Sequence, residues 1–586
     1  MQSDLQQVLA SVLKGYLSQR LNAPSGAFED TCSAVSYERD RTFVQSLDDR
    51  PRYMDSENAR AITLLRQTFK WVYKLRAESS EVQNEEAVRS FVSRNCTAGA
   101  WRLPIVQSER WPESKLARVF LLAQQLVQSV TRTYSLGQPC HGPGTTFFGY
   151  DELLAKYAYL ERDVPVQTWR RFRSLFKPSE GSEYIEPLLI ERSLCRLSAV
   201  PKDSRGPRLV APHMASAIWV QQAILDGIQK TVLSHPLFLG TWPGSDRVCT
   251  VQLRDQTVNQ RVAAYASNNP EMYATLDLKD ASDLVSWRLV CFLFKGTALL
   301  RDLYAVRATH VKLPGGHIEK LHMHAPMGSA VCFPIMAISL WSLATAAGWV
   351  MDHEYVCYRP TSKSLWAENK PFVFGDDVII PTRHYNAVKT VFESAGLVLN
   401  NQKCFFGAGG FRESCGCDYY RGYLVTPMLL RRLDIGTLEG SASFMRLANR
   451  LIGDGQEDLG EVIIRSLIQA RRVHSSGASS VAYSSDPHSP VLYYPITSHV
   501  IRANRKLGCR VRYNAGLQRY EVLVRTNLVV EEECRNQRLD SRARLYEALA
   551  ASHHRENSVG VEPRPLANSF GWARKRSRAR NVWIAC

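Results

Sequence analysis

The alternation of apolar and polar residues over 271–283 predicts a β-strand with two different faces. The apolar face can pack on a helical layer, whereas the other face ends in a carboxylate at the carboxyl end of the strand. A helix should follow over 284–290, with Ser282 or Asp283 as its expected N-cap. The two faces are Ala274, Leu276 and Leu278 on one side and Tyr273, Thr275 and Asp277 on the other.

A second apolar run, residues 371–381, predicts a short hairpin with Gly375 in its turn and with Asp376 and Asp377 at its tip. At ~4 Å and an effective dielectric of about 20, two such carboxylates repel each other by roughly 4 kcal/mol. A divalent cation removes that repulsion, and hard oxygen ligands suit Mg²⁺, which commonly acts on phosphates. An ordinary surface turn is the alternative, because Gly and Asp are frequent turn residues.

Asp277 and Asp376 are 99 residues apart (376 − 277 = 99), which leaves room for a helix and its connections. The strand and the hairpin can therefore be neighbours in one sheet, where three carboxylates hold two Mg²⁺ ions about 3.5–4 Å apart. One ion would activate a hydroxyl group, and the other would stabilise a leaving pyrophosphate. Taken in isolation, Asp277 is equally a capping or turn aspartate.

Residues 325–351 contain no charged side chain, and this length suits a membrane span. Pro326, Gly328 and Pro334 interrupt the first half, and no basic flank follows the segment. A helix buried beneath a catalytic sheet is also apolar on all sides. We therefore predict a buried core helix here.

Four further segments have recognisable patterns. Residues 384–395 predict a helix that ends at Gly396, and 397–400 predict a strand. Lys403, just beyond, is either a general acid toward pyrophosphate or an ordinary surface lysine. Residues 1–20 predict an amphipathic helix, and the polar stretch 475–485 predicts an exposed loop.

The chain of 586 residues is long enough for about three or four domains, and its net charge of +17 favours a nucleic-acid partner. Its 14 cysteines lack the spacing of zinc sites. The first residues lack the basic start of a signal sequence. We therefore expect a cytosolic protein with reduced thiols.

Two basic segments are candidates for phosphate binding. Lys202, Arg205 and Arg208 surround a Gly-Pro pair in a predicted loop or hairpin, where they would hold a triphosphate or form a solvated turn. The second segment lies near the C-terminus and combines phosphate contacts with flanking tryptophans, unless it is a disordered tail. Its basic residues are Arg574, Lys575, Arg576, Arg578 and Arg580.

Taken in order, these motifs resemble the RNA-directed RNA polymerase subunit, or replicase beta subunit, of levivirus-type positive-strand RNA bacteriophages. The resemblance covers residues ~141–430, and its strength lies in the order of motifs that are individually weak. The matching segments are His141–Gly144, Ala199–Lys202 with Arg205 and Arg208, Asp255–Arg261, Asp277–Asp283, Met327–Ser329, Phe374–Asp377, Asn400–Lys403 and Phe411–Gly416.

Two positions depart from the family pattern. Phe374 stands where the family has Tyr, and its ring is expected to pack the hairpin. Ser329 replaces the Asn whose amide helps to read the ribose 2′-hydroxyl in the family. Asp283 and Ser329 can both accept a hydrogen bond from that hydroxyl, and they are the candidate sugar-sensing residues.

The resemblance implies an α+β fold, a right-hand polymerase with fingers, thumb and a palm whose antiparallel sheet carries the Gly-Asp-Asp hairpin. The expected division is 1–190 for the N-terminal region and fingers, 191–265 for fingers with the basic motif, 266–430 for the palm, and 431–586 for the thumb and a basic extension. It implies RNA-templated RNA synthesis, with two Mg²⁺ (or Mn²⁺) ions held by Asp277, Asp376, Asp377 and the carbonyl of Leu278.

The resemblance also implies partners and a location. These are the RNA template and product, nucleoside triphosphates, the host elongation factors Tu and Ts, and a small-subunit ribosomal protein, all in the cytoplasm of a bacterial host. Two other functions remain open. A non-catalytic RNA-binding or packaging protein would also explain the positive charge. A reverse transcriptase shares paired aspartates but should carry a bulky aromatic residue near 281–283.

Overall fold

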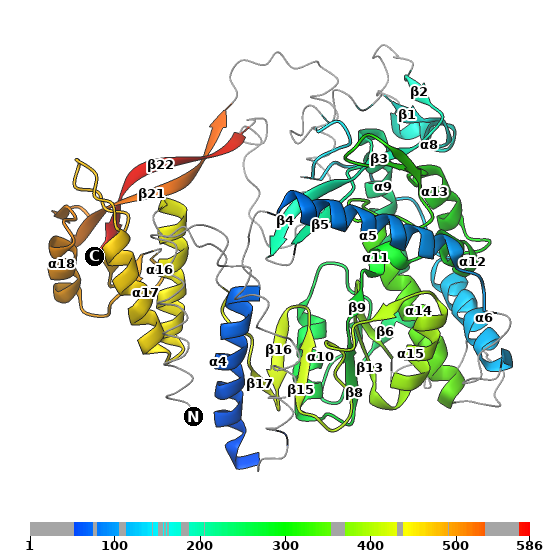
Figure 1. Ribbon diagram of the computed structural model, residues 1–586, viewed down its shortest axis with the longest axis horizontal. Coiled ribbons are helices and arrows are strands. Elements are labelled where there is room, and N and C mark those ends of the chain that lie inside the picture. Colours follow the sequence, from blue (N-terminus) through cyan, green and yellow to red (C-terminus); the bar gives the residue numbers. More distant parts are fainter. Residues whose placement is uncertain are drawn as a thin grey trace.

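The computed structural model shows an α+β fold in which helices cover mostly antiparallel sheets, as the sequence predicts (Figure 1). A large core unites elements from residue 101 to residue 404, and residues 428–586 supply a separate core of their own. The structure describes residues 48, 52–73, 79–104, 113–142, 144–149, 156, 160, 163–176, 187–203, 206–352, 370–429, 437–489, 491–533 and 573–586. The predicted helix over 1–20 lies outside these residues.

At the centre is an antiparallel sheet of order β12-β13-β8, which we call the central sheet. Its side chains alternate between two cores, so both faces are covered by helices. Ala274, Leu276 and Leu278 lie in the large helical core, which confirms the predicted apolar face. The elements are β8 (Tyr273–Leu276), β12 (Phe372–Phe374) and β13 (Asp377–Pro381), with α6 (Glu113–Val130), α14 (Cys332–Asp352) and α15 (Tyr385–Ser394) on one side and α10 (Thr257–Asn268) on the other.

Helix α14 is the uncharged segment singled out in the sequence. It is the one helix within the described ranges that is long and apolar enough to cross a membrane. In its most apolar window, 89% is buried inside the fold. The prediction of a buried core helix is therefore confirmed. The prediction of a helix before Gly396 is confirmed as well, since α15 ends at Ser394 and Gly396 has φ +83°.

The helix expected after Asp277 differs from the prediction. It is split into α11 (Ala281–Leu284) and α12 (Trp287–Leu293), and Ser286 caps α12 by accepting the N–H of Arg288. Neither Ser282 nor Asp283 is the cap. The reason is a tertiary contact. Val285 leaves the helical conformation, and its carbonyl accepts a hydrogen bond from the N–H of His324 at 2.7 Å.

Above the central sheet, helix α5 runs across two small sheets (Figure 1). Its start is fixed by a capping box in which Ser80 and Gln83 bond each other's backbone N–H. The elements of this region are β1 (Val164–Pro165), α8 (Val166–Phe172), β2 (Leu189–Ile190), β3 (Leu194–Arg196), β4 (Ser198–Asp203), β5 (Gly206–Val210), α9 (Ala215–Gly227), α13 (Ala298–Val306), β10 (His310–Lys312), β11 (Ile318–Lys320) and α5 (Glu81–Ala100).

A three-stranded sheet, β15-β16-β17, lies beside α10 and is held by a buried arginine. The guanidinium of Arg412 donates to the carbonyls of Pro270, Tyr273 and three residues between 407 and 411. Burial lowers the pKa of Arg412 to about 10. Helix α4 packs against this sheet on its outer side (Figure 1). The elements are α4 (Asp55–Tyr73), β15 (Phe411–Ser414), β16 (Cys417–Tyr420) and β17 (Tyr423–Leu424).

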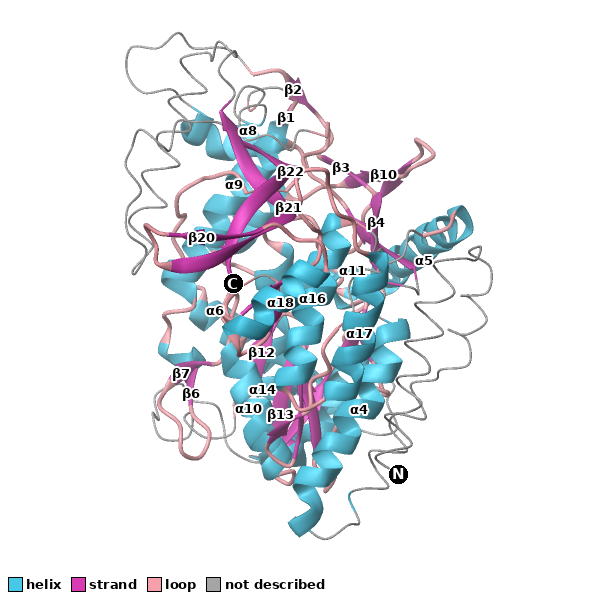
Figure 2. Cartoon of the chain, turned by 90° about the vertical axis from the view of Figure 1, so that its left-hand side faces the viewer, coloured by secondary structure: helices cyan, strands magenta, loops and turns pink. Residues whose placement is uncertain are grey.

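The described residues between 437 and 586, which we call the C-terminal unit, combine three helices with a long twisted sheet (Figure 2). The prediction of an exposed loop at 475–485 is wrong, because Ala478, Ser479 and Val481 are fully buried. Hydroxyl and backbone hydrogen bonds satisfy this polar stretch, among them Arg525 N–H to the Ser479 carbonyl. The elements are α16 (Leu438–Gly453), α17 (Glu457–Ala470), β18 (Tyr483–Ser484), β19 (Leu492–Tyr493), α18 (Thr497–Lys506), β20 (Val511–Asn514), β21 (Arg519–Glu533) and β22 (Ala573–Ala585).

The remaining elements are short connections. They are η1 (Arg52–Met54), η2 (Arg173–Phe176), η3 (Ile228–Val232), η4 (Pro236–Phe238), β6 (Leu239–Gly240), β7 (Val248–Cys249), β9 (Leu278–Lys279), η5 (Thr382–His384) and β14 (Val398–Leu399).

Candidate active site

The strand register of the central sheet brings the predicted aspartates together. Val378 of β13 pairs with Leu276 of β8. Since antiparallel pairing moves back one residue for each step forward, the next step places Asp377 opposite Asp277. Directly opposed side chains in such a pair begin about 4.5–5.5 Å apart. Asp376 adjoins them in the turn between β12 and β13, and we call these three residues the aspartate cluster.

In the aspartate cluster the charged form of each carboxylate is disfavoured. Burial, followed by the charges of Asp376 and Asp277, raises the pKa of Asp377 to about 7. The pKa values of Asp277 and Asp376 are raised too, with burial as the largest cause in each. Asp376 keeps an exposed surface at the hairpin tip. A site of this kind favours either protonation or a bound cation.

One cation of the chain already contacts the cluster. The Nζ of Lys403 lies 3.5 Å from Oδ1 of Asp277, and the amide of Asn400 donates to Oδ2 at 2.9 Å. The amide oxygen of Asn400, Oδ1, is buried and finds no hydrogen-bond partner among the described residues. The site therefore has an excess of oxygen acceptors over donors. Lys403 is thus placed beside the cluster, as the sequence suggested.

The turn between β15 and β16 forms another wall of the site. The backbone N–H of Cys415 donates to the carboxylate of Asp377 and lowers its pKa, whereas the charge of Glu413 raises it. Cys415 has φ +50° and Gly416 has φ +73°, values that suit a tight hairpin. Asn259 of α10 also donates to the backbone carbonyl of Asp377 at 3.2 Å.

The tip of the β12–β13 hairpin requires glycine. Gly375 has φ +63°, and a Cβ there would lie 2.1 Å from the ring of Phe333. Phe333 in turn meets Phe374 edge-to-face at 5.1 Å. The expected packing role of Phe374 is therefore confirmed.

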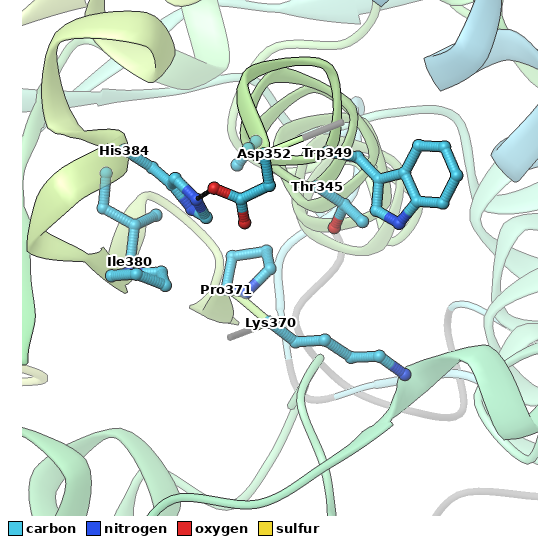
Figure 3. Close-up of a pocket in the computed structure, with 10 residues that line it drawn as sticks. Thr345, Trp349, Asp352, Lys370, Pro371, Ile380 and His384 are labelled. Carbon is cyan, nitrogen blue, oxygen red and sulfur yellow. Dashed lines mark hydrogen bonds and ion pairs between the residues drawn. The ribbon is translucent and has the colours of Figure 1, made fainter. Parts of the chain in front are cut away.

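The base of the same hairpin is anchored by charged groups around a cavity of about 30 Å³ (Figure 3). Lys370, two residues before the start of β12, donates hydrogen bonds from its ammonium group to the carbonyls of Leu237 and Leu239. Asp352, the last residue of α14, accepts hydrogen bonds from His384 at 2.9 Å and from Arg383. These contacts anchor the chain on both sides of the hairpin.

The two candidate sugar-sensing residues lie in prepared positions. Asp283 accepts from Arg94 of α5 at 3.0 Å, and Ser329 donates its hydroxyl to Oε1 of Gln221 at 3.1 Å. Gly328, beside Ser329, has φ +124°, and a Cβ there would lie 2.4 Å from a backbone carbonyl of the β5–α9 connection. Sequence patterns give no signal for Arg94 or Gln221, because they are 189 and 108 residues away from their partners.

The basic segment forms the β4–β5 hairpin, so the predicted loop or hairpin is confirmed. Lys202 and Arg208 are exposed on it. The charge of Arg208 opposes the rise in the pKa of Asp376, so this guanidinium lies on the side of the aspartate cluster. Arg205 lies outside the described residues.

The basic C-terminal segment is a strand and not a tail. Residues 573–585 form β22, paired with β21 over its whole length. The register sets Arg574 opposite Glu532 and Lys575 opposite Glu531. The side chains of Arg574, Lys575, Arg576, Arg578 and Arg580 lie outside the described set.

The chemistry of the cluster fits a hard divalent cation, although no ion is part of the structure. The donors are carboxylate and amide oxygens, which Mg²⁺ and Mn²⁺ prefer. Within the described ranges, no group of three or more His, Cys, Asp or Glu side chains is already arranged around one ion position. The carboxylates fit the cation by type and charge, but in this structure their side chains do not surround one ion position.

Comparison with known proteins relates this site to a family. Residues 196–465, which include the central sheet and the aspartate cluster, match the family model described as RNA replicase, beta-chain. The predicted resemblance to the phage replicases is confirmed over this part of the chain.

Individual relatives agree with that match. The chain is 31% identical over 232 residues to the RNA-directed RNA polymerase subunit beta of Escherichia virus Qbeta, covering 40% of this chain and 34% of the relative. It is 30% identical over 205 residues to the RNA-directed RNA polymerase beta chain of Enterobacteria phage fr, covering 35% and 34%. The matched region thus spans about a third of the length of these relatives.

Among solved structures, one similar chain is an insertion-loop deletion mutant of the RNA-dependent RNA polymerase of a human picobirnavirus. It has 8% sequence identity and a TM-score of 0.39, covering 74% of this chain and 84% of that chain.

Proposed function

We propose that the chain is an RNA-directed RNA polymerase that replicates the genome of a positive-strand RNA phage. The observation that carries this proposal is the convergence of Asp277, Asp376 and Asp377 at one end of the central sheet, within the segment that matches the replicase family. Burial raises the pKa of all three carboxylates, and the charge of Asp277 adds to the rise at Asp376 and Asp377. Such a site is suited to binding cations that act on phosphates.

The proposal assigns the architecture of a right hand. The central sheet with its helices, within 266–430, would be the palm. The regions 1–190 and 191–265, which include the β4–β5 hairpin, would supply the N-terminal part and the fingers. Residues 431–586 would be the thumb and its extension, and the separate core of the C-terminal unit supports this division.

In the proposed reaction the 3′-hydroxyl oxygen of the growing RNA attacks the α-phosphorus of a nucleoside triphosphate. A phosphodiester bond forms, and the bond to pyrophosphate breaks. Asp277, Asp376 and Asp377, with the carbonyl of Leu278, would hold two Mg²⁺ or Mn²⁺ ions, which supply charge neutralisation and hydroxyl activation when bound. Lys403, already within 3.5 Å of Asp277, is the candidate donor of a proton to the leaving pyrophosphate.

The surrounding residues would select and hold the substrate. Lys202, Arg205 and Arg208 on the β4–β5 hairpin are the candidate triphosphate ligands, since guanidinium groups match phosphate geometry. Asp283 and Ser329 are the candidate readers of the ribose 2′-hydroxyl. Arg94 and Gln221 hold these two side chains in fixed directions, which is what a sugar-reading pair requires.

Further parts of the proposal concern partners and place. Template and product RNA are the expected ligands, and the basic residues of β22 (Arg574, Lys575, Arg576, Arg578 and Arg580) would contact phosphates. The host elongation factors Tu and Ts and a small-subunit ribosomal protein would complete the enzyme in the bacterial cytoplasm.

Two other functions make different demands on the same residues. A packaging protein would use the positive charge but would not need three neighbouring carboxylates with raised pKa values. A reverse transcriptase would exclude ribose with a bulky aromatic residue, whereas residues 281–283 here are Ala, Ser and Asp.

The test is nucleotide incorporation on single-stranded RNA, with Mg²⁺ or EDTA, with ribo- or deoxyribonucleoside triphosphates, and with bacterial extract as a source of host factors. We expect Mg²⁺-dependent, ribonucleotide-selective product that disappears in Asp376→Asn while RNA binding is retained. Full activity in Asp376→Asn would refute the assignment. Tight RNA binding without product, even after purified elongation factors are added, would favour the packaging protein.

A further inference from the structure

A pocket of about 470 Å³ lies away from the aspartate cluster, between helices α5, α12 and α13 and strand β11. Its lining contains none of the three aspartates. Gly99 near the end of α5 and Trp287 at the start of α12 form part of its wall. The volume lies within the range of pockets that hold small organic ligands.

The pocket carries an excess of positive charge. Arg288 and Lys320 line it as exposed side chains, and neither has an ion-pair partner among the described residues. Arg307 lines the same pocket and is half-buried, and its guanidinium donates to the carbonyls of Leu321, Met323 and His324. Burial lowers the pKa of Arg307 to about 10, so the group still carries its charge at neutral pH.

Acidic side chains add little negative charge to the described lining of the pocket. Glu191 is the one carboxylate in it. His322 adds no charge at neutral pH, since burial and the neighbouring cations Lys320, Arg307 and Arg288 lower its pKa. The balance of charge in the pocket therefore favours an anion.

Aromatic rings supply a second kind of contact. Trp287 is fixed by stacking on His324, with centroids 5.7 Å apart and an interplanar angle of 18°, and by Arg307 at 5.0 Å from its ring. Tyr304 stands 6.4 Å from Trp287 and is 63% exposed. An exposed tyrosine beside free cations is suited to stacking a nucleobase whose phosphate meets the cations.

A third feature points independently to a ligand. Ser193 lines the pocket with 6% of its surface exposed, yet its hydroxyl has no hydrogen-bond partner within the described structure. Its backbone carbonyl is bonded to Thr309, which holds the residue in place. A buried hydroxyl without a partner is destabilising unless something outside the chain satisfies it.

We propose that this pocket binds a nucleotide, with the base on Tyr304, the phosphate between Arg288 and Lys320, and a polar group of the ligand on the Ser193 hydroxyl. Free nucleotides and unpaired nucleotides of an RNA strand share this chemistry. The binding does not depend on the aspartate cluster, so it stands or falls separately from the polymerase activity.

The test uses the full chain and two photoreactive probes, 8-azidoadenosine 5′-monophosphate and a short oligoribonucleotide containing 4-thiouridine. Labelled peptides are identified by mass spectrometry, and labelling is titrated in the wild type, Tyr304→Ala, Arg288→Ala and Arg301→Ala. Arg301 is the matched control, because it is exposed on the same helix as Tyr304 but does not line the pocket. Asp376→Asn serves as a variant of the other site.

We expect labelled peptides from the pocket and roughly tenfold weaker labelling in Tyr304→Ala. A weaker salt dependence is expected in Arg288→Ala. Arg301→Ala and Asp376→Asn should label like the wild type. Protection by adenosine monophosphate would identify free nucleotide as the ligand, and protection by oligoribonucleotide alone would identify an RNA strand. Labelling confined to peptides around Asp376, or unchanged in Tyr304→Ala, would overturn the proposal.

Discussion

Two sheets of this protein carry carboxylates whose pKa values are shifted in opposite directions. In the C-terminal unit, Glu521 of β21 accepts hydrogen bonds from Arg512, Asn514 and Arg519, and its pKa is lowered, chiefly by Arg512. In the central sheet, burial and then the charges of Asp376 and Asp277 raise the pKa of Asp377 to about 7.

This difference separates a structural acid from a candidate functional one. The chain has ample arginine, and at Glu521 it uses two guanidinium groups on one carboxylate. In the aspartate cluster, Lys403 lies 3.5 Å from Asp277, and Arg208 acts on Asp376 through its charge. Within the described ranges no ion pair to Asp376 or Asp377 is present. Unsatisfied negative charge that persists in a chain of net charge +17 indicates a site prepared for an external cation.

The largest expected effect comes from neutralising the cluster. Asp376→Asn should lower nucleotide incorporation at least about a thousandfold, because charge stabilisation by bound metal contributes several kcal/mol. Incorporation of labelled ribonucleotide measures this. Asp458→Asn, an exposed acid of α17, is the control and should keep full activity. Comparable losses in both variants would remove the distinction between the two kinds of acid.

The next effect is on stability and its dependence on pH. In EDTA, Asp377→Asn should be more stable than the wild type above pH 7, by up to about 4 kcal/mol. Below the ordinary pKa of 3.8, Asp377 is protonated in the folded and unfolded states, so the variant gains nothing there. Between 3.8 and about 7 the folded protein keeps a proton that the unfolded chain has released. The stabilising contribution of that proton is therefore lost as the pH rises.

Thermal unfolding of both proteins between pH 4 and pH 8 measures this gain. A gain of equal size at both ends of the range would contradict the electrostatic origin. A loss at pH 8 would show that the aspartate stabilises the fold.

The same chemical change in the C-terminal unit should act in the opposite direction. Glu521→Gln removes the charge that Arg512 and Arg519 share, so it should lower the midpoint of thermal unfolding, by less than the change at Asp377. Glu457→Gln, on the exposed first turn of α17, is the matched control and should leave the midpoint unchanged. A rise in the midpoint of Glu521→Gln would erase the contrast between the sheets.

The smallest effect is expected at Ser329. Ser329→Ala removes one neutral hydrogen bond to the sugar, so the preference for ribo- over deoxyribonucleotides should fall by about two- to tenfold. The ratio of incorporation rates measures this. Ser339→Ala, whose hydroxyl bonds within α14, is the control. An unchanged ratio would assign sugar reading to Asp283 or to the backbone.

The sequence predicts those parts of the fold that depend on the order of apolar, polar and glycine residues within one short segment. Alternation along 271–277 and 371–381 places the strands of the central sheet, and Gly375 marks its turn. The apolar run of α14 and the glycine after α15 are equally local signals. The three aspartates lie on or beside these elements, so the sequence predicts the local position of each, whereas their proximity depends on the register between β8 and β13.

The parts that sequence did not predict depend on distant partners. Ser286 caps α12 because the chain around residues 322–324 pairs with it and breaks the helix. The polar stretch 475–485 is buried because backbone groups of the C-terminal unit satisfy it. Glu413 and Cys415 were visible as part of a motif, yet their contact with Asp377 depends on the placement of the β15–β16 hairpin.

Helix α4 has a consequence for the order in which the protein assembles during synthesis. Its Arg66 and Lys70 pair with Asp418, and its Gln67 bonds Gln456, so its partners emerge about 350 to 390 residues later. At about 5–20 residues per second, the ribosome needs roughly 20–70 s to supply Asp418 after α4. During that interval the native contacts of Arg66, Gln67 and Lys70 with these residues cannot form. The docking of α4 onto Asp418 therefore closes a loop of about 350 residues, which costs more chain entropy than a contact between neighbouring residues.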